Sequence, residues 1–329
     1  MRLDGGPKAG EQRNMDDAPS HAQEITAVIC THNRYDVLPD AIESLTAQSL
    51  SADAIEILII DNSSDISAQR DYWSLRELPH NAVLLVEGIP GLSRARNLAL
   101  REARAPVIAY LDDDAIAMSE WCASIVEAFR SIEDAGIVGG PVEPIWPETS
   151  PSWLHRWQRG FLTIVDYGGD VRGLSDSEWL AGTNIAFRTS ILREAGGFNE
   201  ALGRTGSALL SNEELAVTRK ILDLGLRAYY LPQARVMHRV HAERATQRWL
   251  RQRVCWQAVS DLLSGAQKPA REQCWNDMAS YLGSLPIEMR GMRGFFLDTP
   301  DPEIFYSQCR ALEALMHLAL NEAEDPERE

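Results

Sequence analysis

The segment Ile25-Thr-Ala-Val-Ile-Cys-Thr-His-Asn-Arg34 is the stretch from which the fold can be worked out. Its first six residues form a short apolar run with β-branched side chains, which is typical of a buried strand. Further runs of this kind occupy Ile55–Ile60, Ala82–Val86 and Pro106–Leu111. Apolar residues at helical spacing predict helices at about Val37–Gln48, Leu92–Ala103 and Ser119–Ile132. This alternation predicts an α/β fold, with a mostly parallel sheet covered by helices on both faces.

The second half of the chain has a less regular pattern. It predicts a strand at Thr183–Arg188, a helix at Ser211–Leu224 that ends before Gly225, and short strands within Ala228–Met237. Beyond Glu243 the pattern is helical, with breaks near 265–269 and 285–286. We therefore expect a mainly helical C-terminal extension.

The composition is that of an ordinary globular protein. The chain has 329 residues, of which 45% are hydrophobic and 24% charged, enough for one large or two modest domains. Its formal net charge of −16 argues against a nucleic-acid partner, because contacts to phosphates need a basic face. No apolar stretch of the sequence approaches the roughly 20 residues that span a bilayer, so we expect no transmembrane segment.

The first residues and the cysteines bear on localisation. Residues 1–24 are polar and lack the apolar core of a secretory signal, so we expect a disordered tail. The five cysteines are scattered and form no C-x-x-C pair, which favours reduced thiols over a zinc or disulfide framework. We predict a cytoplasmic protein, and peripheral attachment at the inner face of the membrane is left open.

Three predicted strands end in polar residues. The ends are Thr31-His-Asn-Arg34, Asp61-Asn-Ser-Ser-Asp65 and Asp112-Asp-Asp114. In open α/β sheets, ligands bind beyond the carboxyl ends of the strands, so these residues favour a binding site at one edge. The sequence contains neither a G-x-G-x-x-G fingerprint nor a P-loop. A nucleotide would therefore have to be recognised by side chains.

Asp112-Asp113-Asp114 is the sharpest chemical feature. Adjacent carboxylates repel one another, and a hard divalent cation such as Mg²⁺ or Mn²⁺ relieves that repulsion. The alternative is a solvated acidic turn that caps the next helix. The segment Gly91-Leu-Ser-Arg-Ala-Arg-Asn97 opens a predicted helix, where Arg94 and Arg96 would suit a phosphate. The alternative for these two arginines is ion pairing with surface acids.

Further candidates come from the second half of the chain. Glu213 and Glu214 begin a predicted helix, where they either stabilise the helix dipole or provide a general base. His238 ends a predicted strand and is either structural or an additional metal ligand. Arg239–Arg253 holds five arginines, which form either a solvated helix face or part of the donor side. Four tryptophans could stack on a sugar or simply pack in the interior: Trp146, Trp153, Trp157 and Trp179.

Taken in order, these segments resemble a family 2 glycosyltransferase of the GT-A fold. The resemblance runs from about Ile25 to Arg253. It rests on the motifs Thr31-His-Asn-Arg34, Ile60-Asp-Asn-Ser-Ser64, Gly91-Leu-Ser-Arg-Ala-Arg-Asn97, Leu111-Asp-Asp-Asp114, Gly182-Thr-Asn-Ile-Ala-Phe-Arg188, Gly196-Gly-Phe-Asn199, Asn212-Glu-Glu214 and Val236-Met-His238. It implies a Rossmann-like sheet in a catalytic domain over 25–253, divided into a nucleotide-binding half (25–115) and an acceptor half (116–253), followed by a helical extension over 254–329.

The resemblance implies transfer of a sugar from a nucleotide-diphosphate donor to an acceptor hydroxyl, with inversion at the anomeric carbon. The residues that it assigns to the nucleotide sugar are Thr31, Asn33, Arg34, Asp61, Ser93, Arg96, Asp112, Asp113, Gly182 and Asn184. Among them, Asp61 would accept an N–H of the base, and Arg96 would lie near the ribose or the diphosphate. The implied ligands for Mn²⁺ or Mg²⁺ are Asp114, Asp113 and His238.

The family's glutamate–aspartate pair falls on Glu213 and Glu214. We expect Glu214 to be the general base and Glu213 to be a structural or sugar-binding partner. The family's usual glycine before this pair is Asn212 here, which we expect to alter the loop geometry. A flexible acceptor loop is expected at Gly206, Ser207 and Ser211.

The partners follow from the same resemblance. A UDP-type donor is favoured, and the acceptor is left open between a glycan, a lipid-linked molecule and a small molecule. The C-terminal helices would pack on the core, form a homo-oligomer or hold a partner enzyme. The alternatives are a non-catalytic nucleotide-sugar-binding scaffold and a sugar-1-phosphate nucleotidyltransferase. The latter is disfavoured because Thr31–Arg34 is not glycine-rich.

Overall fold

The computed structural model describes residues 23–202, 212–264 and 269–323. The chain divides into two compact units. Unit 1 comprises residues 1–143, 165–201 and 213–238, and unit 2 comprises residues 144–164, 202–212 and 239–329. Residues 1–22 of the predicted tail and all three residues of the predicted acceptor loop lie outside the described ranges.

Unit 1 is built around an eight-stranded sheet in the order β3-β2-β1-β4-β9-β6-β10-β8. Its strands are β1 (Ile25–Thr31), β2 (Ile55–Asp61), β3 (Ala82–Val86), β4 (Val107–Asp112), β6 (Ala135–Gly139), β8 (Arg172–Gly173), β9 (Asn184–Arg188) and β10 (Arg227–Tyr230). Strands β3, β2, β1 and β4 run parallel, whereas β9 is antiparallel to β4 and β6. The predicted mostly parallel α/β sheet is confirmed.

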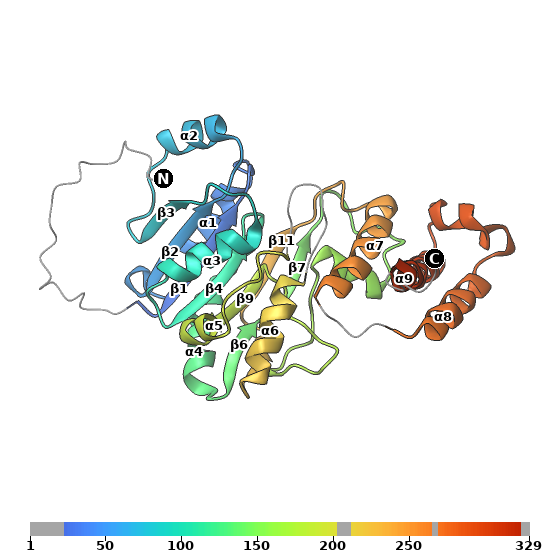
Figure 1. Cartoon of the computed structure of the whole chain (residues 1–329). Coiled ribbons are helices and arrows are strands. Elements are labelled where there is room, and N and C mark those ends of the chain that lie inside the picture. The colour runs from blue at the N-terminus through green and yellow to red at the C-terminus, as the bar shows by residue number, and fades with distance from the viewer. Residues whose placement is uncertain (1–22, 203–211, 265–268, 324–329) are drawn as a thin grey trace, which may run out of the picture. The chain divides into compact units, whose positions relative to one another are not determined.

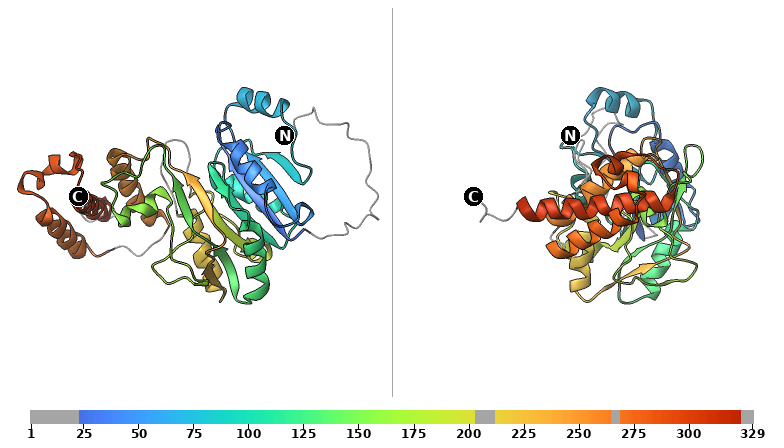
Figure 2. Two further views of the ribbon diagram at one scale, coloured as in Figure 1. Left: turned by 180° about the vertical axis from the view of Figure 1, so that it is seen from behind. Right: turned by 90° about the vertical axis from the view of Figure 1, so that its right-hand side faces the viewer.

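Helices cover both faces of this sheet, because the strands are apolar on both sides (Figures 1 and 2). One layer holds α1 (Leu38–Thr46) and α4 (Trp121–Ser131), which pack on Ala27, Ile29 and their neighbours. The other layer holds α3 (Leu92–Glu102), α5 (Thr189–Glu194) and α6 (Glu213–Asp223). These helices pack on the alternate strand residues, such as Val28 and Ile108. The side-chain alternation of a strand thus divides the core into two clusters.

Several smaller elements flank the strands of the large sheet. Helix α2 (Ile66–Ser74) follows β2, and a 3-10 turn, η1 (Ala52–Ala54), precedes β2. A three-stranded sheet has the order β5-β11-β7. Its strands are β5 (Ala115–Ala117), β7 (Val142–Ile145) and β11 (Val236–Arg239). Because β5 comes directly after the acidic triplet and pairs with β11, it brings His238 opposite Ala115.

Unit 2 is helical, as predicted for the C-terminal part. It contains α7 (Gln247–Leu263), α8 (Arg271–Ser284), α9 (Pro302–Ala323) and the 3-10 helices η2 (Arg156–Leu162), η3 (Ile287–Met289) and η4 (Met292–Phe296). Helix α9 packs against both α7 and α8. Helix α7 runs across residue 253, where the sequence analysis placed the end of the catalytic domain. The division at that residue stays a prediction. Within the described ranges, no helix combines the length and the apolar character needed to cross a bilayer.

Candidate functional site

Polar residues from three neighbouring parallel strands meet at one edge of the sheet in unit 1. Thr31 at the end of β1 is in register with Asp61 at the end of β2, and Cys30 is in register with Asp112 at the end of β4. The strands end together because their hydrogen-bonded ladders run in register. The structure therefore brings together the three strand ends that the sequence analysis singled out.

The acidic triplet is held by residues of the first strand end. Arg34 donates from Nη1 to Asp113 Oδ1 over 2.8 Å and from Nη2 to Asp114 Oδ2 over 2.6 Å. The hydroxyl of Thr31 donates to Asp113 Oδ2 over 2.8 Å. Burial raises the pKa of Asp113 to about 6, although Arg34 opposes that shift. Thr31, Arg34 and Asp113 thus form one connected polar cluster.

Three side chains could hold a metal ion at this edge. One ligand atom from each of Asp112, Asp114 and His238 lies within 4.8 Å of the others. His238 Nε2 is 3.2 Å from Asp114 Oδ1, and both residues are buried. The other ring nitrogen of His238, Nδ1, is buried and makes no hydrogen bond within the described part of the chain. The two carboxylates suit Mn²⁺ or Mg²⁺, with the imidazole as an additional nitrogen ligand, so these residues fit the cation implied by the resemblance.

This group differs from the predicted metal ligands in one residue. It contains Asp112, whereas the sequence analysis named Asp113 together with Asp114 and His238. Both oxygens of Asp113 already accept hydrogen bonds from Thr31 and Arg34. Asp112 is the more exposed carboxylate, with 34% of its side chain accessible. The geometry therefore favours Asp112 over Asp113 at a metal.

Arg96 lies at the centre of a second cluster, on the first turns of α3. Its side chain is 2% exposed, and Nη1 donates to Glu214 Oε1 over 2.9 Å and to Glu213 Oε1 over 3.2 Å. Nη2 donates to the carbonyl oxygen of Gly182 over 3.2 Å and lies 3.7 Å from Asp112 Oδ1. Burial alone would lower the pKa of Arg96, but these carboxylates outweigh it and raise the pKa. One guanidinium thus connects the metal-binding candidates to the candidate base.

The two glutamates of α6 differ in exposure. The side chain of Glu213 is 4% exposed, and that of Glu214 is 17% exposed. Both begin the helix, where a carboxylate is stabilised by the helix dipole. Of the two, Glu214 has the more accessible carboxylate. This difference favours Glu214 as the base and Glu213 as a buried partner.

Asn212 precedes this pair in the left-handed conformation, with φ of 78°. Glycine adopts this conformation without strain, and asparagine tolerates it better than most residues do. The backbone at Asn212 therefore has a left-handed conformation for which a glycine would also be suited. The expectation that Asn212 alters the loop geometry gains no support from this residue's own backbone conformation.

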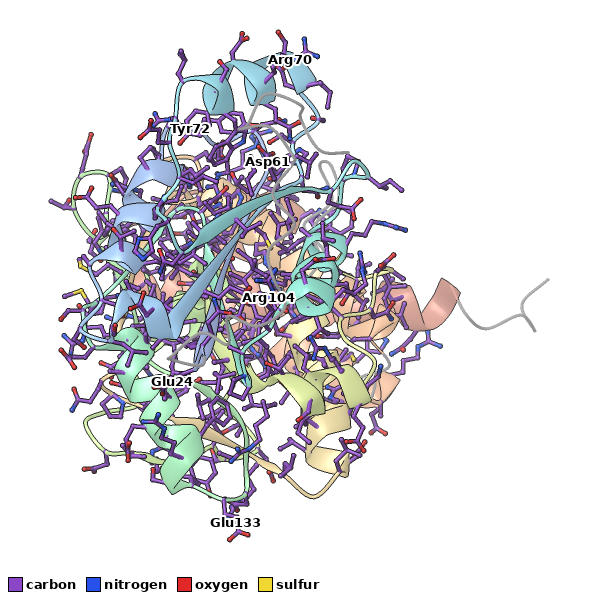
Figure 3. All side chains as sticks on the ribbon, turned by 90° about the vertical axis from the view of Figure 1, so that its left-hand side faces the viewer. Glu24, Asp61, Arg70, Tyr72, Arg104 and Glu133 are labelled. Carbon is purple, nitrogen blue, oxygen red and sulfur yellow. The ribbon has the colours of Figure 1, made fainter. Side chains whose placement is uncertain are left out.

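Asp61 is fully buried, and its carboxylate is already engaged by the protein. Trp73 on α2 donates from Nε1 to Asp61 Oδ2 over 2.6 Å, and the hydroxyl of Tyr35 donates to the same oxygen over 2.9 Å. The backbone N–H of Ser63 donates to Oδ1 over 3.0 Å. Tyr72 stacks on Tyr35 with ring centroids 4.5 Å apart, so α2 and its aromatic residues cover Asp61 (Figure 3). In this arrangement Asp61 anchors α2 and is not accessible to a nucleotide base.

The remaining predicted nucleotide-sugar residues have different surroundings. Asn33 lies in an exposed turn and donates to Ser64 Oγ over 2.9 Å. Ser93 is buried in the first turn of α3. Asn184 is completely buried. Its Nδ2 donates to two backbone carbonyl oxygens, and its Oδ1 accepts a hydrogen bond from Trp121 Nε1. Asn184 therefore joins β9 to its neighbours rather than facing a ligand.

Several residues that could have served a ligand are instead engaged by other side chains of the protein. Arg94 pairs with Glu200 over 3.0 Å, which is the alternative that the sequence analysis left open. Within unit 2, Arg251 pairs with Asp298 over 2.8 Å, and Arg253 packs over the ring of Phe161. The four tryptophans pack in hydrophobic clusters, with Trp146, Trp153 and Trp157 in unit 2 and Trp179 in unit 1.

Sequence reasoning missed the residues that surround Asp61. Tyr35 directly follows the first strand-end motif, and Tyr72 and Trp73 lie together on α2. Tyr35, beside the first strand-end motif, was the available signal. Its meaning depended on α2 folding back over β2, which no local pattern indicates.

The chain is similar to proteins of one family. The sequence model described as Glycosyl transferase family 2 matches residues 26–196, just over half of the chain. The glucosyl-dolichyl phosphate glucuronosyltransferase of Haloferax volcanii is 27% identical over 267 residues, which are 80% of this chain and 83% of that protein. The succinoglycan biosynthesis protein ExoM of Rhizobium meliloti is 25% identical over 312 residues, or 91% of this chain and 92% of that protein.

A solved structure shows the same fold. The mannosyltransferase PcManGT from Pyrobaculum calidifontis, in complex with GDP-Man and Mn²⁺, matches with a TM-score of 0.56 at 16% identity. The match covers 94% of this chain and 89% of that chain. The likeness confirms the predicted GT-A architecture. Glu213, Glu214 and His238 lie beyond the residues matched by the family model, so their placement comes from the structure.

Proposed function

The chain belongs to glycosyltransferase family 2, and on that premise we propose that it transfers a sugar from a nucleotide-diphosphate donor to an acceptor hydroxyl with inversion at the anomeric carbon. The observation that carries this proposal is the convergence of two groups around Arg96. The candidate metal ligands Asp112, Asp114 and His238 form one group, and Glu213 with the accessible Glu214 forms the other. The proposed metal-assisted inverting transfer uses both, one at the leaving group and one at the attacking hydroxyl.

We propose that Glu214 is the general base. Its carboxylate would remove the proton from the acceptor hydroxyl as that oxygen attacks the anomeric carbon. Its partial exposure permits contact with an acceptor, whereas the burial of Glu213 does not. A single displacement of this kind inverts the anomeric configuration, because the nucleophile enters opposite the leaving group. Positioned general bases typically contribute about 10²–10⁴ in rate.

We propose that Asp112, Asp114 and His238 hold a divalent cation, Mn²⁺ or Mg²⁺. When bound, such a cation neutralises negative charge on the diphosphate leaving group. Arg34 orients the triplet through Asp113 and Asp114 and keeps Asp114 in place. Mn²⁺ accompanies GDP-Man in the structure of the mannosyltransferase PcManGT, which supports a similar requirement here.

The donor and the acceptor are proposed by class. We propose that the donor is a nucleotide-diphosphate sugar, with UDP favoured as its nucleotide. We propose that it binds beside Thr31, Arg34 and Asp112. The relative from Haloferax is named for a glucosyl-dolichyl phosphate, and on that basis we propose a lipid-linked glycan as the first acceptor to test. Because the carboxylate of Asp61 is buried under α2, we propose that residues other than Asp61 recognise the nucleotide base.

Two variants test the base assignment. Glu214→Gln is expected to bind UDP with Mn²⁺ as the wild type does and to lose about 10²-fold or more of turnover. The matched control is Glu194→Gln, an exposed glutamate at the end of α5, which should leave turnover unchanged. Turnover is measured as Mn²⁺-dependent release of UDP or GDP from a panel of sugar nucleotides. Near-normal turnover by Glu214→Gln rejects Glu214 as the base.

A binding screen separates catalysis from recognition alone. Thermal unfolding of the wild type with UDP or GDP, with and without Mn²⁺, should show a metal-dependent rise in melting temperature. Product formation from a matched donor and acceptor would then exclude the non-catalytic scaffold, which is expected to show the rise alone. No rise with either nucleotide would contradict nucleotide-sugar recognition.

Two predictions, on the cellular location of the protein and on its oligomeric state, stay proposals. The first is a cytoplasmic location. It is supported by the five cysteines, which lie in the described part of the chain, because none of them forms a disulfide there. The second is a homo-oligomer formed through α7, α8 and α9. Trp275 on α8 is 50% exposed, which leaves an apolar side chain available on that helix. Sedimentation velocity measures the oligomeric state directly.

A further inference from the structure

We propose that Arg96 is a positioning residue rather than a ligand of the donor diphosphate, and that Arg96 and Gly182 together fix the carboxylate of Glu214. We call this arrangement the Arg96 clamp. The inference rests on the proposed role of Glu214 as the base. It assigns Arg96 and Gly182 a function different from the one that their sequence motifs imply.

The contacts of Arg96 leave little of it for a substrate. Its side chain is 2% exposed, and both terminal nitrogens are engaged with protein oxygens. Aromatic rings lie beside the guanidinium, with its central carbon 5.3 Å from the Phe198 ring and 5.8 Å from the Tyr110 ring. An arginine that binds a diphosphate has to reach the phosphate oxygens with its N–H groups. The geometry of Arg96 instead satisfies the chain's own carboxylates.

The charges explain why Arg96 is suited to this place. Glu213, Glu214 and Asp112 lie within 4 Å of its guanidinium, and Glu213 is nearly as buried as Arg96 itself. Without the positive charge, these carboxylates would repel one another in a poorly solvated site. The planar guanidinium also bridges several acceptors at once, which the point charge of a lysine cannot do.

Gly182 supplies the space that the carboxylate of Glu214 occupies. A Cβ atom added at this position would lie 1.7 Å from Glu214 Oε1 and 2.5 Å from Arg96 Nη2. These distances are far below van der Waals contact, so both atoms would have to move. Each is the far end of a long side chain. An alanine would therefore displace the Glu214 carboxylate and the Arg96 guanidinium while the backbone stays folded.

The first test is structural and does not depend on activity. Crystal structures are compared for the wild type, Gly182→Ala and the control Gly169→Ala. Gly169 lies in a loop of unit 1 where an added Cβ meets no atom within 4 Å. We expect Gly182→Ala to move Glu214 Oε1 out of hydrogen-bond distance of Arg96 Nη1, and Gly169→Ala to leave that contact intact. An unmoved Glu214 in Gly182→Ala overturns the role of Gly182.

The second test separates positioning from donor binding. Hydrolysis of UDP-glucose and GDP-mannose with Mn²⁺ is followed by release of the nucleoside diphosphate. For Arg96→Lys and Gly182→Ala we expect kcat to fall about 10²-fold, with KM for the donor changed by less than about twofold. Isothermal titration with UDP and Mn²⁺ should give wild-type affinity for both variants. A large loss of UDP affinity in Arg96→Lys would make Arg96 a diphosphate ligand and overturn the proposal.

A double-variant comparison shows whether Gly182 and Arg96 act through Glu214. In the Glu214→Gln background, adding Gly182→Ala or Arg96→Lys should cost no further turnover, because the group that they position is gone. Losses that simply add would contradict the clamp. Normal turnover by Glu214→Gln alone is a different result, because it rejects the proposed base while the crystal structures still decide whether the clamp exists.

Discussion

Replacing Trp73 by phenylalanine removes a hydrogen bond to a completely buried carboxylate. Trp73 Nε1 donates to Asp61 Oδ2 over 2.6 Å, and Asp61 has no exposed surface. After the change, Asp61 retains the donors from Tyr35 and from the backbone of Ser63. Water cannot replace the lost donor without opening the contact between α2 and the end of β2. The buried carboxylate of Asp61 therefore has fewer hydrogen bonds to compensate for its loss of contact with water.

The expected loss follows from the charge on the acceptor. A hydrogen bond to a charged group contributes about 1.5–3 kcal/mol, and we expect Trp73→Phe to lower the free energy of unfolding by that amount. Burial raises the pKa of Tyr35, so Tyr35 stays protonated and continues to donate to Asp61 in both proteins. The phenyl ring keeps most of the contact with Tyr72, whose ring centroid is 4.8 Å from that of Trp73.

The measurement is urea denaturation followed by circular dichroism, with the slope of the transition compared between proteins. The control is Trp275→Phe, which changes a half-exposed tryptophan on α8 and should shift stability by less than about 0.5 kcal/mol. A loss below about 0.5 kcal/mol in Trp73→Phe would refute the view that Asp61 anchors α2.

Further predictions concern other parts of the molecule. His238→Ala should weaken Mn²⁺ binding in the presence of UDP, because it removes the imidazole from the group formed with the two aspartates, and unchanged Mn²⁺ titration would exclude His238 as a ligand. Gly140→Ala should destabilise the protein by more than about 2 kcal/mol in guanidinium denaturation, because the added Cβ would lie 2.2 Å from the backbone oxygen of Ala234, and wild-type stability would contradict this close approach. Burial raises the pKa of the Cys309 thiol to about 12, so the reactive thiolate is scarce at pH 8, and mass spectrometry should find Cys309 alkylated by iodoacetamide only after unfolding. Rapid labelling of the folded protein at pH 8 would show that Cys309 is accessible and ionised.

The elements predicted from sequence share one property, which is that their signals are local. The apolar runs of β1, β2, β3 and β4 appear in the structure within one residue of the predicted limits. For β1, β2 and β4 the reason is that a strand covered on both faces is mostly apolar along its length. The helices α1, α3 and α4 follow from apolar spacing in the same way. The polar strand ends could also be found locally, since each follows directly on its strand.

The roles of individual site residues required information that is not local. Asn184 and Asp61 occupy positions that the family motif associates with the donor, yet their polar atoms are used inside the protein. Asp112 is grouped with Asp114 and His238 because of the turn into β5 and the pairing of β5 with β11. A motif reports which residue types are present, whereas their partners depend on which distant segments pack beside them.

The sequence by itself determined that this chain is an α/β protein with acidic and basic residues at the carboxyl ends of its strands. It also indicated the family, because the ordered motifs are specific as a set. The tertiary structure decided which carboxylates face solvent and which basic side chains they contact. Arg96 and Glu214 are 118 residues apart, and they share a hydrogen bond only because α3, α6 and the Gly182 segment pack at one place. A side chain's chemical role depends on its burial and its neighbours, and those are properties of the folded chain.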